Sequence, residues 1–230
     1  LLHDVEYRSL LEVEGDFVEL PSQIMENWAF HPELLKNYAL HYRTNDVIPQ
    51  HLIEKLKRSE LFNQGFMTTE LVAAALTDLD IHSITSYEPF DPVAFERNAL
   101  YEQRKMNPEI EPRYHYPYFS HIFDGGYSAG YYFYIWAEVL DKDAFAAFAE
   151  SGDYFNREIA ARFRTLLESG GEKDGMSLYR DFRGGDPDKT AMLVGRGLIE
   201  KPVEEPENEA ENETAAETEK VEAVADDGWH

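Results

Sequence analysis

The sequence has no cysteine, few cations and no long apolar run. Without cysteine it can form neither a disulfide framework nor a thiol site, and the redox compartment stays open. Only 21 Lys and Arg stand against 45 Asp and Glu, so the formal net charge is −24 at pH 7. This charge argues against nucleic acid and anionic membrane surfaces as partners. No apolar run reaches the length of about 20 residues that crosses a bilayer.

Strand patterning is also scarce, and helical periodicity fills most of the chain. Residues 61–85 form the longest periodic segment, which predicts one long buried helix or two stacked ones. Other helices are expected over residues 21–30, 32–42, 49–59, 92–106, 127–150, 154–169, 175–182 and 187–193. Asp91 and Asp153 are expected to cap two of them. With 43% hydrophobic residues in a chain of 230, the sequence predicts an all-α domain of antiparallel helices.

The last part of the chain, residues 199–230, has a different composition. It holds 12 Asp and Glu against 2 Lys, a net charge of −10, and it shows no apolar periodicity. A segment of this kind buries too little apolar surface to offset the entropy that ordering costs. We therefore expect residues 1–198 to form the folded domain and residues 199–230 to be a disordered, solubilising acidic tail.

An aromatic stretch near the middle of the chain carries three tyrosines behind a pair of glycines. Tyr127, Tyr131 and Tyr134 follow the spacing i, i+4, i+7, so on a helix their phenol groups share one face. Gly125 and Gly126 allow the preceding loop to bend sharply or to move. Core packing is one interpretation of this spacing. A substrate site is the other, because buried hydroxyls need hydrogen-bond partners and a substrate carbonyl supplies one.

Four stretches of the chain carry a resemblance to a known family. They are Asp16-Phe-Val-Glu-Leu-Pro-Ser-Gln23, Leu61-Phe-Asn-Gln-Gly65, Tyr118-Phe-Ser-His-Ile-Phe-Asp-Gly-Gly-Tyr-Ser-Ala-Gly-Tyr-Tyr-Phe-Tyr134 and Gly195-Arg-Gly-Leu198. Together they resemble the M3 zinc oligopeptidases, which include thimet oligopeptidase, oligopeptidase A and, nearest to this chain, bacterial peptidyl-dipeptidase. The resemblance implies a neurolysin-like, multi-helix C-terminal catalytic portion. It also implies a peptidase that cuts short peptides inside a deep channel.

The resemblance gives Glu19 a role that its position alone does not. By itself, a carboxylate at a helix start is a capping or surface group. In the family, the third zinc ligand is the glutamate of this motif, which here is Glu19. The other two ligands are the histidines of a His-Glu-x-x-His segment, which is absent from these 230 residues and is expected just before Leu1. A catalytic zinc ion takes three protein ligands. We therefore expect one zinc ion to bind only with the missing N-terminal part present, and this chain alone to be inactive.

The resemblance also implies roles for the aromatic stretch. Tyr127 and Tyr134 match family tyrosines that stabilise the oxyanion of the transition state. His121 and Tyr131 match groups that bind the substrate. The glycine loop Gly125-Gly126 is expected to contact the substrate as well.

Two functions from different classes follow from these patterns. The first is a zinc metallopeptidase acting on short peptides, with the N-terminal part of the same enzyme as its partner and with neither nucleic acid nor membrane. The alternative is a non-catalytic helical module that binds peptides or proteins and has lost the metal site. An in-frame His-Glu-x-x-His upstream of Leu1 would distinguish them. A cytoplasmic location is expected, with export to the periplasm or beyond left open.

Overall fold

The computed structural model describes residues 12–86 and 88–201. The chain divides into two units, Leu1–Ile199 and Glu200–His230, and the helices described below belong to the first. The expected acidic tail lies almost wholly outside the described residues, so its disorder and its boundary after residue 198 stay predictions. Within residues 12–86 and 88–201, none of the helices combines the length and the apolar character that a membrane span requires.

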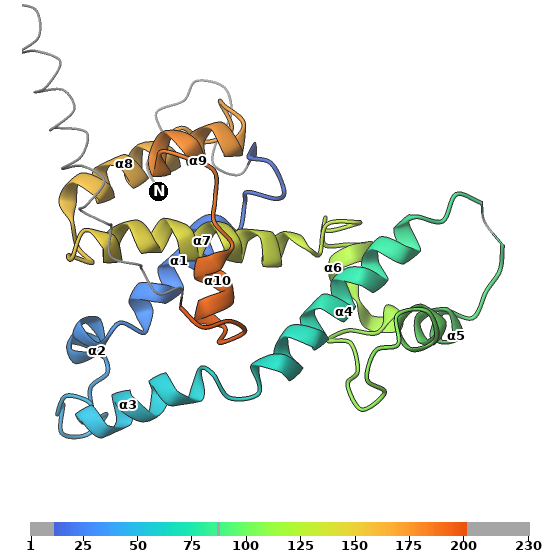
Figure 1. The fold of residues 1–230 in the computed structure, drawn as a ribbon, viewed down its shortest axis with the longest axis horizontal. Helices are drawn as coiled ribbons and strands as arrows, with labels where there is room; N and C mark the ends of the chain where they lie inside the picture. Colours follow the sequence, from blue (N-terminus) through green and yellow to red (C-terminus); the bar gives the residue numbers. More distant parts are fainter. Residues whose placement is uncertain (1–11, 87, 202–230) are drawn as a thin grey trace, which may run out of the picture. The chain divides into compact units, whose positions relative to one another are not determined.

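The described residues form helices joined by turns, which confirms the prediction of an all-α fold (Figure 1). The helices are α1 Leu20–Ala29, α2 Pro32–Tyr38, α3 Gln50–Ser59, α4 Gln64–His82, α5 Pro92–Arg97, the π-helix η2 Asn98–Gln103, the 3₁₀-helix η3 Tyr116–Tyr118, α6 Ser120–Phe123, α7 Phe133–Glu150, α8 Arg157–Glu168, α9 Gly175–Arg183 and α10 Thr190–Gly195. In the part of the chain that the structure describes, β pairing is limited to one isolated antiparallel bridge between Leu40 and Val47.

Several helix ends differ from the prediction. The helix expected over 32–42 ends at Tyr38, because the chain then turns back to form the Leu40–Val47 bridge. The segment expected over 92–106 changes from the α-helix α5 to the π-helix η2 at Asn98. The long segment expected over 61–85 is a single helix, α4, which begins after Asn63 in the left-handed conformation at φ 55°.

The two expected caps have different outcomes. Asp91 caps α5, because its carboxylate accepts from the backbone N–H groups of Val93 and Ala94. Asp153 as the cap of α8 is wrong, since Asn156 holds that position. The Asp153 carboxylate instead accepts from the Phe155 N–H at 2.9 Å, within the turn that precedes the helix. Asn and Asp serve equally well as caps and turn residues, so composition alone does not separate the two positions.

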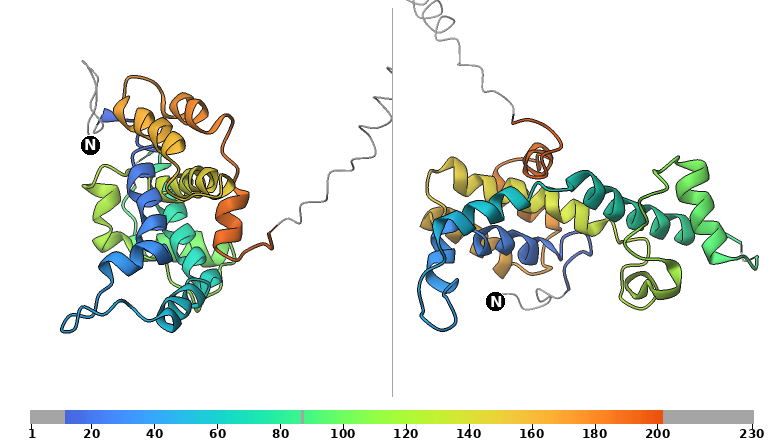
Figure 2. Two further views of the ribbon diagram at one scale, coloured as in Figure 1. Left: turned by 90° about the vertical axis from the view of Figure 1, so that its left-hand side faces the viewer. Right: turned by 90° about the horizontal axis from the view of Figure 1, so that it is seen from below.

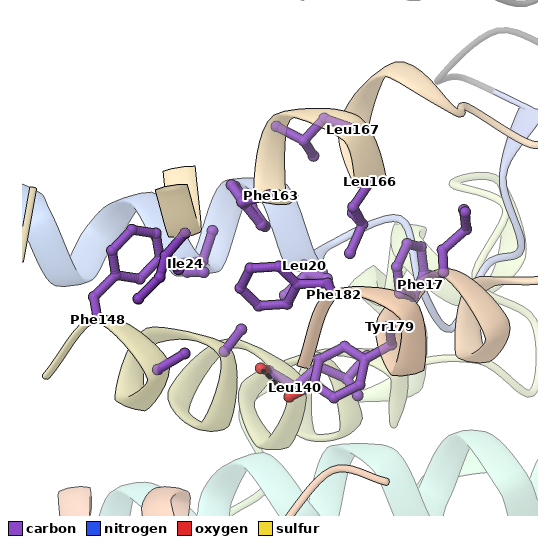
Figure 3. Packing of buried hydrophobic residues seen from close by; sticks show 14 residues of the cluster. Phe17, Leu20, Ile24, Leu140, Phe148, Phe163, Leu166, Leu167, Tyr179 and Phe182 are labelled. Atoms are coloured by element: carbon purple, nitrogen blue, oxygen red, sulfur yellow. Dashed lines mark hydrogen bonds between the residues drawn. The ribbon is translucent and has the colours of Figure 1, made fainter. Parts of the chain in front are cut away.

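The first hydrophobic core surrounds α7, with α1 and α10 packed directly against that helix. Figures 1 and 2 show α8 and α9 lying together on one side of α7. Figure 3 shows how side chains from α1, α7, α8 and α9 meet in this core. Its fully buried members include Leu20, Ile24, Leu140 and Tyr179. Each such aliphatic side chain contributes about 1.5–3 kcal/mol relative to full exposure, so this core fixes α1 on α7.

A second core lies on α4 and holds the aromatic stretch. Its buried members are Leu71, Ala74, Ala75, Tyr116, Phe119, Ile122 and Tyr131. Tyr127 and Tyr134 pack against it from the side and stay partly exposed. The tyrosines therefore rest on α4, which is far from them in the sequence.

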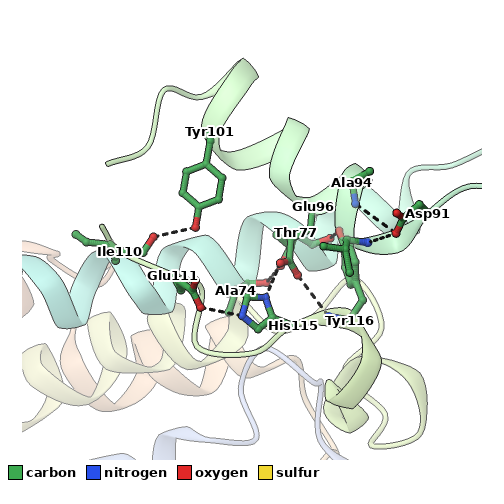
Figure 4. A network of polar contacts seen from close by, with 11 residues as sticks. Ala74, Thr77, Asp91, Ala94, Glu96, Tyr101, Ile110, Glu111, His115 and Tyr116 are labelled. Atoms are coloured by element: carbon green, nitrogen blue, oxygen red, sulfur yellow. Dashed lines mark hydrogen bonds and ion pairs between the residues drawn. The ribbon is translucent and has the colours of Figure 1, made fainter. Parts of the chain in front are cut away.

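A polar network fastens the proline-rich segment that leads to the aromatic stretch (Figure 4). The buried Glu96 carboxylate of α5 lies 2.5 Å from Nδ1 of His115, and the other ring nitrogen lies 3.2 Å from Glu111. The Tyr116 hydroxyl donates to the Thr77 carbonyl on α4 at 2.7 Å. Burial lowers the pKa of His115, but the two carboxylates more than offset it and the net pKa is raised. This network fixes the direction in which the chain enters α6.

Candidate active site

A cavity of about 410 Å³ brings the predicted glutamate and two of the predicted tyrosines together. It is lined by Glu19, Ser22, Gln23, Glu26, Leu71, Arg113, Tyr131, Tyr134, Glu138, Asp141, Lys142 and Arg196. A second hollow of about 820 Å³ adjoins it, because both are lined by Glu26, Arg113, Glu138, Lys142 and Arg196. Elements from both ends of the described chain thus build one open site.

Glu19 stands at the N-cap position of α1, but its side chain makes no capping hydrogen bond. Ser22, one turn later, donates its hydroxyl to Oε2 of Glu19 at 2.8 Å. The Tyr127 hydroxyl donates to the other oxygen, Oε1. The carboxylate is therefore held at both oxygens and presented to the cavity, which a purely capping role would not require.

The three tyrosines come together, although the prediction of one continuous helix over 127–150 is wrong. Helix α7 begins only at Phe133, so Tyr127 and Tyr131 lie in the turns before it. The rings of Tyr127 and Tyr134 stack at 5.2 Å with an interplanar angle of 13°. The rings of Tyr131 and Tyr134 meet edge to face at 5.3 Å. A compact turn thus gathers the phenols that the helical spacing had placed on one face.

All three phenols remain protonated at neutral pH. Burial raises the pKa of Tyr127, and its hydrogen bond to Glu19 raises it further. Burial also raises the pKa of Tyr134. It raises the pKa of Tyr131 to about 12, partly offset by the nearby Arg113 guanidinium. Each hydroxyl is therefore a hydrogen-bond donor and not a phenolate.

His121 lies among these rings. Its ring centroid is 5.7 Å from that of Tyr131, 6.1 Å from that of Tyr127 and 6.5 Å from that of Tyr134. Its Nδ1 atom is buried and has no hydrogen-bond partner within residues 12–86 and 88–201. A buried polar atom left unpaired costs about 1–3 kcal/mol. His121 itself is not among the residues that line the cavity of about 410 Å³.

The glycine pair folds the loop back onto His121. A Cβ atom at Gly125 would lie 2.8 Å from Cα and 2.9 Å from the carbonyl oxygen of His121, closer than any side chain tolerates. Gly126 adopts φ +82°, in the left-handed region that favours glycine. The Tyr127 N–H then donates to the His121 carbonyl at 3.0 Å. The glycines therefore place His121 beside Tyr127.

Sequence reasoning missed several residues of the cavity. Arg113 follows a proline-rich loop without periodicity, and its guanidinium pairs at 3.6 Å with Glu70. Gln23 lies one turn after Glu19 and donates from Nε2 to the Tyr134 carbonyl at 3.1 Å. The family-like motif contained Gln23, and its position one turn beyond Glu19 was the available signal. No comparable signal marked Arg113.

A buried acid also borders the cavity. Asp141 on α7 is 2% exposed, and burial raises its pKa to about 6. The Asn27 amide donates to it at 2.9 Å, and the Lys142 ammonium donates to the Asn27 oxygen at 2.6 Å. Asn27 thus bridges an acid and a base that face the same space.

The donor set limits what this chain can hold by itself. Within the part of the chain that the structure describes, no group of three His, Cys, Asp or Glu side chains is arranged to bind a metal ion. Glu19 is a single carboxylate, whereas catalytic zinc takes three protein ligands. The described residues alone therefore do not make a zinc site.

Comparison with known proteins places this cavity in a family. A sequence model of peptidase family M3 matches residues 3–198. Dipeptidyl carboxypeptidase of Escherichia coli (strain K12) is 43% identical over 185 residues, which are 80% of this chain and 27% of the relative. Organellar oligopeptidase A of Arabidopsis thaliana is 39% identical over 194 residues, 81% of this chain and 24% of the relative. Oligopeptidase A of Escherichia coli (strain K12) is 38% identical over 190 residues, 81% of this chain and 27% of the relative.

The family match covers every residue of the cavity described above, from Glu19 to Arg196. The chain spans only 24% to 27% of the length of these three relatives. The matched part of each relative therefore corresponds to the helical portion that holds Glu19, His121 and the three tyrosines. On this evidence the chain belongs to peptidase family M3.

Proposed function

We propose that the complete protein is a zinc-dependent peptidase that hydrolyses short peptides, and that Glu19 is one of its metal ligands. Membership of peptidase family M3 supports this proposal. The observation that carries it is the convergence of Glu19, Tyr127 and Tyr134 on one site. Two histidines from the remainder of the protein complete the metal site in this proposal. A bound zinc ion would supply a water molecule whose pKa is lowered to about 7.

The tyrosines act on the charge that develops on the substrate. When a peptide carbonyl is attacked, its oxygen becomes an oxyanion that needs hydrogen-bond donors. Tyr134 is fixed on α7 and protonated, and its hydroxyl interacts with Tyr127 and Glu19, so it is a donor beside the proposed metal ligand. The Tyr127 hydroxyl becomes a second donor once its hydrogen bond to Glu19 is broken. One such donor contributes about 3 kcal/mol to the transition state.

His121 and Tyr131 orient the substrate. The unpaired Nδ1 of His121 is buried beside the tyrosines, where a peptide backbone group would satisfy it. Tyr131 is 3% exposed and lines the cavity wall, so it shapes the space more than it reaches into it. The glycine loop between them brings His121 and Tyr127 to the same side.

We further propose that the protein removes dipeptides from the C-terminal end of its substrates. One relative is named a dipeptidyl carboxypeptidase, and such an enzyme must recognise a free carboxylate. Three cationic side chains line the cavity, and two of them already have close hydrogen-bond partners. Arg196 donates to both carboxylate oxygens of Glu138, and Lys142 donates to the side-chain oxygen of Asn27. Arg113 pairs with Glu70 at 3.6 Å, beyond hydrogen-bond distance. Its guanidinium beside Tyr131 is therefore the group best placed to bind a carboxylate.

The test uses the complete protein and quenched peptides with either a free or an amidated C-terminus. We expect chelator-sensitive hydrolysis with kcat/KM at least about 10-fold higher for the free carboxylate. Arg113→Gln should abolish this preference. The exposed Arg157→Gln on α8 is the control and should keep it.

Two outcomes would contradict these proposals separately. Hydrolysis without preference for a free carboxylate would retain the peptidase and reject C-terminal dipeptide removal. Peptide binding without chelator-sensitive hydrolysis would instead support the non-catalytic helical module.

A further inference from the structure

A buried acid, Asp78, binds the backbone of the turn that carries Tyr127 and Tyr131. This residue lies on α4 and is 0% exposed. Its Oδ1 atom accepts from the Ala129 N–H at 2.9 Å, and Oδ2 accepts from the Tyr131 N–H at 2.8 Å. Both oxygens of one carboxylate thus bind the backbone of the same turn, 51 and 53 positions away in the sequence. Charge-assisted hydrogen bonds of this kind are about twice as strong as neutral ones.

The backbone between these two hydrogen bonds is strained. Ala129 adopts φ 55°, a left-handed conformation that costs a residue with a Cβ atom about 1–2 kcal/mol. Such a conformation persists only where the surroundings enforce it. The Asp78 carboxylate provides that enforcement, because it bonds Ala129 itself and the residue two positions later.

His82 extends the anchor to the other side of the glycine loop. Its Nδ1 atom lies 2.8 Å from Oδ1 and 3.0 Å from the backbone carbonyl oxygen of Asp78, and because both of these groups only accept, the imidazole donates. The His82 ring also packs at 6.0 Å against Phe123, the last residue of α6. The Asp78–His82 pair therefore touches the chain before Gly125 and after Gly126.

The location of this anchor distinguishes it from ordinary buried polar groups. Asp143 is a second buried acid, 4% exposed, and it too is well partnered. Its partners are the Tyr179 hydroxyl at 2.7 Å and the Arg183 guanidinium at 3.3 Å, both on α9. Asp143 thus joins two helices of the first core, whereas Asp78 holds the backbone from which Tyr127 and Tyr131 project.

We propose that Asp78 is a positioning residue of the active site. By fixing Ala129 and Tyr131 it sets the place of the Tyr127 hydroxyl relative to Tyr134 and Glu19, and His82 supports it. The catalytic part of this proposal rests on the proposed peptidase function. The anchoring part does not, because it concerns hydrogen bonds within this chain.

The first experiment measures amide hydrogen exchange in the 230-residue chain. Asp78→Asn keeps the shape but leaves one oxygen and one NH₂ group, so one of the two backbone N–H groups loses its acceptor. We expect exchange at Ala129 and Tyr131 to rise at least about 10-fold, because the turn opens more often. Asp143→Asn is the matched control and should not change exchange at these two positions. His82→Gln, a milder change at a partly exposed side chain, should act in the same direction as Asp78→Asn with a smaller rise.

The second experiment measures steady-state kinetics of the complete protein carrying the same substitutions. We expect Asp78→Asn to lower kcat about 10- to 100-fold, since misplacing a catalytic group by about 1 Å costs this much. The zinc content should be that of the wild type, because the proposed metal ligand is not altered, and KM should shift together with kcat, because Tyr131 lines the cavity wall. Asp143→Asn should lower the melting temperature and leave kcat unchanged.

These two experiments can fail independently. Unchanged exchange at Ala129 and Tyr131 in a folded Asp78→Asn or His82→Gln variant would overturn the anchor. Increased exchange with unchanged kcat would overturn the positioning role. If the complete wild-type protein cleaves no peptide, the proposed function fails, and the exchange experiment alone decides whether Asp78 holds the turn.

Discussion

The hydroxyl of Tyr127 donates a hydrogen bond to the carboxylate of Glu19, a residue 108 positions away in the sequence. This contact joins a candidate metal ligand to a candidate oxyanion donor. A hydroxyl that bonds Glu19 cannot bond a substrate oxygen at the same time. The contact therefore implies that Tyr127 must rotate away from Glu19 when it takes part in the reaction.

Replacing the two stacked tyrosines by phenylalanine should therefore have different effects in the complete protein. Tyr134→Phe should lower kcat about 100-fold or more with little change in KM, because the lost donor acts only on the transition state. Tyr127→Phe should change both kcat and KM, because this residue rides on the glycine loop. Steady-state kinetics on a short quenched peptide, with thermal melts alongside, measure both effects. Normal turnover in both variants would show that these tyrosines pack the core and do not act on the transition state.

Glu19→Ala should remove zinc and activity together from the complete protein. Losing one ligand of three destabilises the metal site, whereas the helices are held by the two hydrophobic cores. Metal analysis and circular dichroism check the two halves of this prediction. Ser22→Ala, which removes only the hydroxyl that orients Glu19, should lower zinc affinity by about 10-fold. Full zinc occupancy in Glu19→Ala would show that another residue holds the metal.

Asp141 should make the stability of the chain fall as the pH rises. Its pKa is raised from 3.8 to about 6 in the folded chain, so between these values the folded state binds more protons than the unfolded state. Stability from this group is complete below about pH 4 and declines by up to about 3 kcal/mol as the pH rises past 6. Asp141→Asn should remove this decline, because the amide still accepts from Asn27 and does not ionise. Denaturant unfolding at pH 4.5 and 7.5 compares the two proteins; equal pH dependence would contradict the raised pKa of Asp141.

Gly125→Ala should destabilise the chain, since its methyl group would lie within 3 Å of the His121 backbone. Backbone cannot move aside as a side chain can, and overpacking of this kind costs about 1–3 kcal/mol. Gly185→Ala is the matched control, because a Cβ atom there meets nothing within 4 Å. Thermal melts of both variants measure the difference, and equal melting temperatures would show that the loop adapts.

Local patterns in the sequence were enough to predict the helices and some of their ends. Apolar spacing located α4 and the helices of the first core, and the Asp91 cap followed from residue type. The start of α7 could not be found in this way. The spacing of Tyr127, Tyr131 and Tyr134 fits one helical face, but the structure gathers the same three residues with a turn before α7. The left-handed Ala129 depends on Asp78, which lies 51 positions earlier. Such a tertiary contact leaves no trace in local periodicity.

For the site, the resemblance to a family supplied what periodicity could not. It singled out Glu19 and His121, which carry no local signal, and the structure brings both beside the tyrosines. Arg113 and Asp78 were missed for a physical reason. Each acts through a partner on another element, so neither an isolated charge nor its spacing shows what it faces.

The hydrogen bond from Gln23 to the Tyr134 carbonyl has a mechanical consequence. Because α1 packs directly on α7 and this bond spans them, Glu19 and Tyr134 belong to one rigid body. If the proposed peptidase closes over a peptide by a hinge motion, the separation of Glu19 and Tyr134 would stay unchanged. In the proposed peptidase, closure over a substrate would then require other parts of the protein to move toward this fixed pair. Variants that loosen such a hinge would alter how fast peptides enter and leave, while the chemical step on a bound peptide would keep its rate.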